Sequence, residues 1–192
     1  MLILNKNILT IGGNRLEGGP LTPPTPPTPA DEVIIGTQTW KNVNLAIDDG
    51  QGGVKIVEDL VYGPLYYYTQ AAANRISDSI QGYHLPSESD WATLITYCGG
   101  TYAAGKKLKS TYGWLNNGNG TDDYGFCALP FGCYWGSTSK FMNTRAMFRT
   151  STVGSSNNKF VEMSNTTDNA AITQGSNLYN SDYASVRLIK DT

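Results

Sequence analysis

The chain has 192 residues, of which 40% are hydrophobic and 16% are charged, and its formal net charge is −2. No stretch is basic enough to predict a nucleic-acid partner, and none is long and apolar enough to predict a membrane span. Three cysteines make an odd count in so long a chain, which indicates reduced thiols and argues against a disulfide framework.

A proline-rich stretch, TPPTPPTP, separates a short N-terminal segment from the rest of the chain. Proline fixes φ and removes the backbone N–H donor, so residues 22–30 are predicted to be a polyproline II linker. At ~3.1 Å per residue, its eight-residue repeat would span roughly 25 Å. Residues 31–192 have the length of one domain with its own core. The sequence therefore predicts three parts: residues 1–21, 22–30 and 31–192.

The N-terminal segment, residues 1–21, is predicted to hold the protein in an assembly. It reads as one or two short strands that can add to the edge of another protein or another copy. Burying each of six large apolar side chains near its start contributes ~1.5–3 kcal/mol, but ordering the segment costs ~1–2 kcal/mol per residue. A partner surface must therefore bury these anchor residues, and the alternative is an unstructured tail. They are Leu2, Ile3, Leu4, Ile8, Leu9 and Ile11.

The start of the chain makes a poor signal peptide. Asn5 and Lys6 interrupt its apolar run, and no clean small-residue cleavage site follows. We therefore expect synthesis in the cytoplasm without Sec export.

The domain opens with the pattern of a hairpin, EVIIG followed by TQTW, and GGVKIVEDLVYG then predicts a loop and a strand. Apolar residues at helical spacing predict a helix over Leu65–Ser79. A second helix is predicted over Ser87–Gly99, because Ser87 is a natural N-cap and Asp90 completes a capping box.

Beyond Gly100 the sequence predicts no long helix. Short apolar stretches such as GKKLKSTYGW, TRAMFRTSTV and NKFVEMS alternate with Gly, Asn and Ser turns, which is typical of short strands. The fold class is therefore α+β, with helices packed against a mostly antiparallel sheet.

Five stretches follow, in order, the pattern of one known family. They are IGTQTW, YGPLY, GYHLPSESDWATL, GKKLKSTYGWLNNGNGTDDYGFCALPFG and SVRLIKD. On these motifs, residues 35–191 resemble the Fibrobacter succinogenes major paralogous domain. That family resembles the C-type lectin fold, in the branch shared with formylglycine-generating enzymes and with retroelement-diversified variable proteins. The resemblance implies a compact α+β domain with two helices, a twisted antiparallel sheet, long loops, and N- and C-terminal strands that pair.

The sequence departs from the family pattern in its cysteines and in one aromatic run. Leu188 replaces the usual cysteine of the last strand, and the cysteine expected before the GYHLP motif is missing. MFRTST stands where the family has an aromatic run, so the surface built there is expected to differ. Most family members are exported with disulfides, and these departures agree with the expected reducing compartment.

The cysteines and the single histidine predict neither a zinc site nor an enzyme. Cys98 shares a helix face with Trp91, Leu94 and Ile95, which places it in the core. Five residues separate Cys127 from Cys133, which does not suit zinc, and a reducing compartment disfavours the alternative of a disulfide.

His84 is expected to be buried and to fix a loop. The related enzymes use a redox-active cysteine pair near the C-terminus. No cysteine follows Cys133 here, so we expect no catalysis.

The stretch NNGNGTDDYGF alternates oxygen-bearing side chains with glycines, which can wrap a calcium ion. Asn117, Asn119, Asp122 and Asp123 are the candidate ligands, and calcium would be the one cofactor. The EF-hand pattern with its distal glutamate is absent. The favoured interpretation is a loop held by Asx turns.

Asn, Ser, Thr and Tyr are concentrated in NTTDNAAITQGSNLYNSDYAS. Tyrosine offers rigid amphipathic contact area, while Asn and Ser offer adaptable hydrogen bonds. This composition suits the recognition of sugars or protein surfaces, and it equally suits an ordinary solvated loop. Adenine-rich Asn, Ser and Tyr codons also suit diversification by a retroelement. The candidate ligand-binding residues are Tyr134, Trp135, Arg145, Phe148, Arg149, Asn177, Tyr179, Asn180 and Tyr183.

A short anchor, a stiff linker and a lectin-like domain describe a structural protein of a bacteriophage virion. We expect a head fibre, decoration or tail-associated protein that presents its domain to host-surface or environmental glycans or receptors. The anchor would attach to a capsid or tail protein, and bundling of short proline rods suggests a homotrimer. No nucleic-acid or membrane partner is expected. The alternative is a bacterial adhesin, secreted or attached to the cell surface.

Overall fold

The computed structural model describes residues 9–11, 14–16, 31–153, 158–174 and 178–192. The chain divides into two units, Met1–Ala30 and Asp31–Thr192. In the first unit, β1 (Leu9–Ile11) and β2 (Asn14–Leu16) pair as an antiparallel hairpin. The anchor residues Leu2, Ile3, Leu4 and Ile8 and the whole predicted linker lie outside the described residues.

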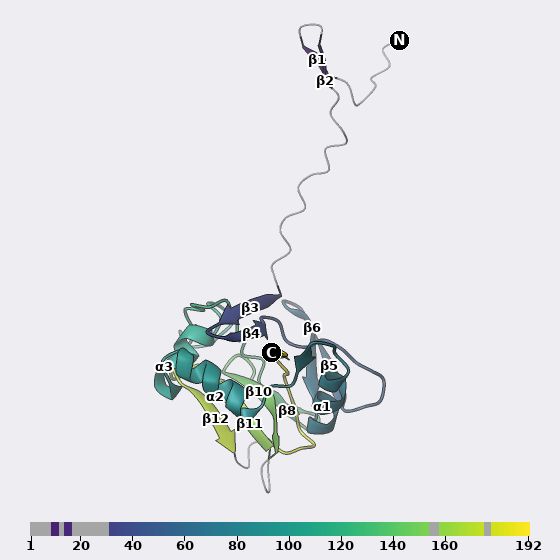
Figure 1. Ribbon diagram of the computed structural model, residues 1–192. Helices are drawn as coiled ribbons and strands as arrows, with labels where there is room; N and C mark the ends of the chain where they lie inside the picture. Colours follow the sequence, from purple (N-terminus) through teal and green to yellow (C-terminus); the bar gives the residue numbers. More distant parts are fainter. Residues whose placement is uncertain (1–8, 12–13, 17–30, 154–157, 175–177) are drawn as a thin grey trace. The chain divides into compact units, whose positions relative to one another are not determined.

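In the described residues, the second unit consists of three antiparallel sheets and three helices (Figure 1). The first sheet has the order β3 (Glu32–Ile35), β4 (Gln38–Lys41), β14 (Ile189–Lys190), β7 (Tyr83–His84). The second has the order β5 (Val54–Asp59), β6 (Gly63–Tyr68), β13 (Tyr183–Ala184), β8 (Cys133–Trp135), β9 (Thr138–Lys140). The third contains β10 (Arg145–Val153), β11 (Asn158–Ser164) and β12 (Ala170–Gln174). This architecture confirms the α+β class.

Strands from the two ends of the domain pair, as the family resemblance implies. In the first sheet Ile189 of β14 lies opposite Trp40 of β4, and on its other side opposite His84 of β7. The hairpin predicted from EVIIG and TQTW is β3 and β4, so that prediction is confirmed.

The first helix, α1 (Gln70–Asp78), is shorter than predicted. Thr69 caps its N-terminus by accepting a hydrogen bond from the Ala72 amide, and residues 65–68 belong to β6 instead. Tyr67 and Tyr68 are both fully buried, because they pack into separate hydrophobic clusters of the domain. A strand buried on both faces carries a continuous apolar run, which imitates the apolar face of a helix.

The second helix, α2 (Glu88–Tyr97), confirms its prediction. Ser87 is the N-cap, and the Asp90 side chain accepts a hydrogen bond from the Ser87 amide, which completes the capping box. Cys98 is fully buried beside the apolar face of this helix, as expected.

A third helix, α3 (Thr101–Leu108), was not predicted and replaces the strand expected at GKKLKSTYGW. Glycine is a poor helix former, but tertiary packing requires it inside this helix. Gly105 permits a close approach, because a Cβ atom there would lie 2.1 Å from the carbonyl oxygen of Asn169.

The largest hydrophobic cluster lies where α2 and α3 pack against the sheet of β10, β11 and β12 (Figure 1). Trp40, Trp91, Phe126 and Phe148 form its aromatic centre, and all four side chains are fully buried. In the described part of the chain, no helix combines the length and the apolar character required to span a bilayer.

Candidate functional site

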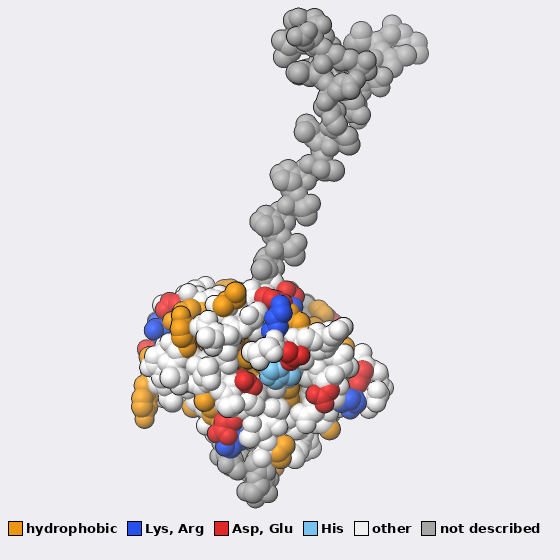
Figure 2. Space-filling view, viewed as in Figure 1, with side chains coloured by type: hydrophobic (Ala, Val, Ile, Leu, Met, Phe, Trp, Pro, Cys, Tyr) orange, Lys and Arg blue, Asp and Glu red, His pale blue; other side chains and the backbone are white. Residues whose placement is uncertain are grey.

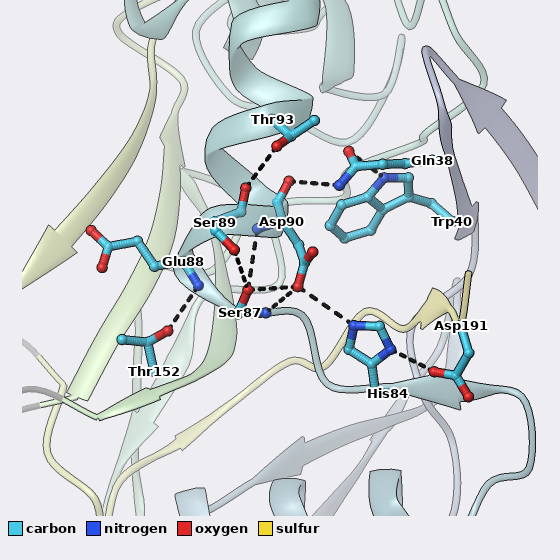
Figure 3. Close-up of polar contacts among 10 residues, drawn as sticks. All are labelled: Gln38, Trp40, His84, Ser87, Glu88, Ser89, Asp90, Thr93, Thr152 and Asp191. Atoms are coloured by element: carbon cyan, nitrogen blue, oxygen red, sulfur yellow. Dashed lines mark hydrogen bonds and ion pairs between the residues drawn. The ribbon is translucent and has the colours of Figure 1, made fainter.

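The GYHLPSESDW stretch forms a polar network at the N-terminus of α2 (Figure 3). His84 Nδ1 lies 2.7 Å from Asp191 Oδ1, and its Nε2 lies 3.5 Å from Asp90 Oδ2. Gln38 donates to the Asp90 carbonyl, and the Glu88 amide donates to Thr152 Oγ1. The network thus fastens the helix to β4, to β10 and to the C-terminal end of the chain.

This network is not arranged as a nucleophile with its base. The Ser87 hydroxyl donates to Asp90 at 2.6 Å, whereas both nitrogens of His84 face carboxylates. A serine nucleophile requires a histidine that accepts its proton. His84 is also more exposed than expected, with 43% of its side chain accessible, and Figure 2 shows it at the surface among charged side chains. The prediction of a buried histidine is therefore wrong, because His84 sits at the rim of its sheet.

Two of the predicted ligand-binding residues belong to the core. Phe148 is fully buried and stacks on Trp91, with ring centroids 5.5 Å apart. Arg149 is also fully buried and donates to the carbonyl oxygens of Tyr68 and Tyr179. Burial lowers the pKa of Arg149 to about 10. Neither side chain reaches solvent, so both leave the candidate set.

The structure brings Tyr134 and Tyr183 together as cross-strand neighbours on β8 and β13. Lys55 lies above both, with its Nζ 5.3 Å from each ring centroid. Tyr134 is nearly buried, and Tyr183 is partly exposed. A lysine therefore covers the pair that the sequence offered for ligand contact.

The remaining predicted ligand residues lie on separate elements. Arg145 pairs with Glu162 at 2.8 Å, and Trp135 packs against Phe141 at the turn between β8 and β9. Tyr179 and Asn180 are exposed on the loop before β13. Asn177 lies outside the described residues.

The calcium candidates hold a loop by side-chain to backbone hydrogen bonds. Asn119 Oδ1 accepts from the Trp114 amide, and Asp122 Oδ1 accepts from the Cys127 amide. Asn117 lines a polar groove beside Lys106 and Lys109, and the positive charge of these two ammonium groups disfavours a calcium ion there. Asp123 is exposed. Over the described ranges, no three His, Cys, Asp or Glu side chains are grouped to hold a metal. Side-chain to backbone bonds do hold this loop, but both span five positions and are therefore not Asx turns.

The described part of the domain contains a pocket of about 280 Å³, here called the tyrosine pocket. Its walls come from five segments: residues 42–46 after β4, residues 62–66 at the start of β6, Tyr112 after α3, residues 127–131 before β8, and Arg187. Tyr62, Tyr66 and Tyr112 give it three phenol rings, and Asn42 and Asn44 give it two amides.

Two tyrosines of the pocket are held side by side by their backbone context. The Asp59 carboxylate accepts from the amides of Val61 and Tyr62, which tightens the turn between β5 and β6. The rings of Tyr62 and Tyr112 are 6.5 Å apart and tilted by only 16°. Gly113 has φ +88°, and a Cβ atom there would lie 2.8 Å from the Tyr62 hydroxyl. Glycine therefore keeps the two tyrosines adjacent.

Arg187 lies at the base of the pocket and holds parts of its wall by hydrogen bonds. It is almost fully buried, and it donates to the carbonyls of Lys41, Phe126 and Cys127. Its Nε and Nη2 both donate to Asn44 Oδ1, at 3.1 and 2.9 Å. Burial lowers its pKa to about 10. One guanidinium thus joins two of the other wall segments, through Asn44 and Cys127.

Cys127 stands in the pocket wall with its thiol 3.8 Å from the Tyr112 hydroxyl. This hydrogen bond is the main cause that raises the pKa of Tyr112 above that of a free phenol. Cys127 is partly exposed, whereas Cys98 and Cys133 are buried, and none forms a disulfide.

Sequence reasoning missed the tyrosine pocket, although it noticed some of its parts. The motif YGPLY was used for the family resemblance and contains Tyr62 and Tyr66. Tyr62 was assigned to the end of a strand and Tyr66 to the start of a helix, so the two rings were not expected to line one pocket. Tyr112 and Cys127 are brought together by backbone pairing between residues 108–110 and Ala128, a non-local contact that no local pattern indicates.

The comparisons with known proteins give one match. The model of the Fibrobacter succinogenes major domain matches residues 33–190. No curated protein and no solved structure matches the chain.

Proposed function

The chain belongs to the Fibrobacter succinogenes major domain family, and from its short anchor segment, proline-rich linker and single domain we propose that it is a display protein of a bacteriophage virion. In this proposal residues 31–192 adopt a C-type lectin-like fold and bind a host-surface or environmental glycan or receptor. The protein acts by binding and not by catalysis.

The observation that supports a binding role is the tyrosine pocket. Polar groups fix the walls of the pocket, since Arg187 donates a hydrogen bond to Asn44. The Cys127 thiol lies beside the Tyr112 phenol and not beside a base. Concave sites with aromatic walls and a few fixed polar groups are typical of ligand binding. Ser87 caps α2, and His84 faces two carboxylates in the adjoining network instead.

The N-terminal segment carries the attachment in this proposal. Its apolar residues need a partner surface, because the segment is too short to bury them by itself. The proline-rich linker then keeps the domain away from the capsid or tail protein that holds the anchor, and bundled linkers favour a homotrimer.

A deletion of residues 1–21 tests this division of labour. The shortened chain should keep the near-UV circular dichroism of the full chain, because residues 31–192 form a separate unit. It should be absent from particles assembled in cells that supply no full-length copy. Incorporation of the shortened chain at normal occupancy would place the attachment in the domain and refute the proposal.

The runner-up function is a bacterial adhesin, and the same binding pocket favours it equally. The two differ in location. A virion protein co-purifies with particles on a density gradient, whereas an adhesin fractionates with the bacterial envelope or the culture medium.

A further inference from the structure

We propose that the tyrosine pocket binds an uncharged saccharide, by stacking a sugar ring against its tyrosines and without a calcium ion. This inference rests on the proposed binding function and names the chemical class of the ligand and the residues that recognise it.

The size of the pocket fits a small ligand. Its volume of about 280 Å³ lies just below the ~300–1,000 Å³ found for drug-sized ligand sites. One or two sugar rings match this size better than an extended peptide does. The pocket is also partly open, since Tyr112 is 51% exposed at its rim.

The walls offer flat apolar faces with polar edges. One side of a pyranose ring is lined with C–H groups, which pack on an aromatic face, while its hydroxyls stay at the periphery. Tyrosine suits such a partner because its ring is apolar and its hydroxyl forms hydrogen bonds. Tyr62 is held against Phe131 in an edge-on contact of 5.1 Å, which fixes the orientation of its ring before a ligand arrives.

Hydrogen-bonding groups stand where sugar hydroxyls would lie. The oxygen of the Asn44 amide is committed to Arg187, which leaves the NH₂ group of that amide as a double donor for a ligand oxygen. Tyr112 keeps its proton to higher pH than a free phenol, because its hydroxyl is hydrogen-bonded to the Cys127 thiol. Neutral donors and acceptors of this kind recognise hydroxyls.

The charge of the pocket selects a neutral ligand. Arg187 is the one charged residue among those that line it in the described part of the chain. Its guanidinium is buried and is already bound to four acceptors, so it offers no free donor pair to a carboxylate. An acidic sugar would lose hydration without gaining an ion pair.

A calcium ion has no ligand set in this pocket. Calcium prefers several carboxylate oxygens, and neither Asp nor Glu lines the pocket among the described residues. The saccharide must therefore be held by the protein groups alone. Chelators should leave its affinity unchanged.

Saturation-transfer NMR on the full chain tests the inference directly. The probes are the methyl glycosides of glucose, galactose, mannose and N-acetylglucosamine, with glucuronic acid as the charged comparison, each with and without EDTA. At least one neutral glycoside should receive saturation, equally with EDTA, and Tyr112→Ala should weaken its binding at least tenfold. The matched control is Tyr102→Ala on α3, whose side chain is 84% exposed and does not line the pocket.

Cys127 supplies a second measurement that needs no substitution. The bound saccharide should slow alkylation of this thiol by iodoacetamide, because Cys127 lines the same pocket. The inference is overturned if none of the neutral glycosides binds, if glucuronic acid binds more tightly, if EDTA abolishes binding, or if the two tyrosine variants behave alike. Preferential binding of a proline-rich peptide that protects Cys127 would also overturn it.

The outcomes separate the inference from the proposed function. If particles carrying Tyr112→Ala still adsorb through this protein, display stands and the pocket is not its ligand site. If the purified chain binds a neutral glycoside through Tyr112 but is never found in particles, the saccharide site stands and the virion role fails.

Discussion

Replacement of Arg187 by methionine is expected to destabilise residues 31–192 strongly and to open the tyrosine pocket. Methionine has a similar length and fills much of the same space. Unlike arginine, it offers no donor to the groups that converge on this position. The variant therefore isolates the hydrogen-bonding role of the guanidinium.

The expected loss in the free energy of unfolding follows from the hydrogen-bond acceptors that the substitution leaves without a donor. Arg187 donates to the carbonyls of Lys41, Phe126 and Cys127 and to the side chain of Asn44. A buried acceptor that loses its donor costs ~1–3 kcal/mol, so four such acceptors give ~4–12 kcal/mol. Methionine also removes the cost of burying the charge, which is the reason that burial lowers the pKa of Arg187 to about 10. We therefore expect the low end, about 4 kcal/mol, which is a large share of the ~5–15 kcal/mol typical of a domain.

Urea denaturation followed by circular dichroism measures this loss. The control is Arg145→Met, which breaks a partly exposed pair with Glu162 and should cost no more than about 1 kcal/mol. If Arg187→Met loses as little as the control, the guanidinium does not clamp the pocket walls and the reasoning fails.

Three further predictions concern the thiols, alkaline pH and the cap of α2. At pH 8 Cys127 should react with a thiol reagent in the native state, while Cys98 and Cys133 should not, because burial raises their pKa values to about 11 and about 12; rapid labelling of all three would contradict this. Burial also raises the pKa of Tyr67. As the pH rises, these thiols and this phenol therefore lose their protons first in the unfolded state, where their pKa values are 9.0 and 10.0. Stability should therefore fall above about pH 9, by up to ~1.4 kcal/mol per pH unit for each group, and a flat pH titration of urea midpoints would refute the sign. Asp90→Ala should lower the free energy of unfolding by about 1–2 kcal/mol through loss of the capping box, and an unchanged urea midpoint would count against that role.

Local patterns predicted those parts of the fold that depend on neighbouring residues. The capping box at Ser87 and the hairpin of β3 and β4 were recognised because their signals lie within a few residues of the elements they define. The family motifs added the pairing of the terminal strands, which no local pattern indicates.

The missed elements are those in which tertiary packing decides the conformation. The start of α1 was placed too early because β6 is buried on both faces. α3 was overlooked because its stretch was interpreted as a strand. Its glycine, Gly105, is explained only by the close approach of the backbone at Asn169. Phe148 and Arg149 were assigned to a surface, although their strand passes through the largest cluster and its border. The tyrosine pocket depends on Arg187, whose partners in the sequence are as far as 146 positions away.

The central claim, that this is a virion display protein, is tested most directly by mass spectrometry of gradient-purified particles produced from the genome that encodes the chain. The account predicts peptides from both residues 1–21 and residues 31–192, at a constant number of copies per major capsid protein. Their absence from particles, together with their recovery in the bacterial envelope or the medium, would contradict it.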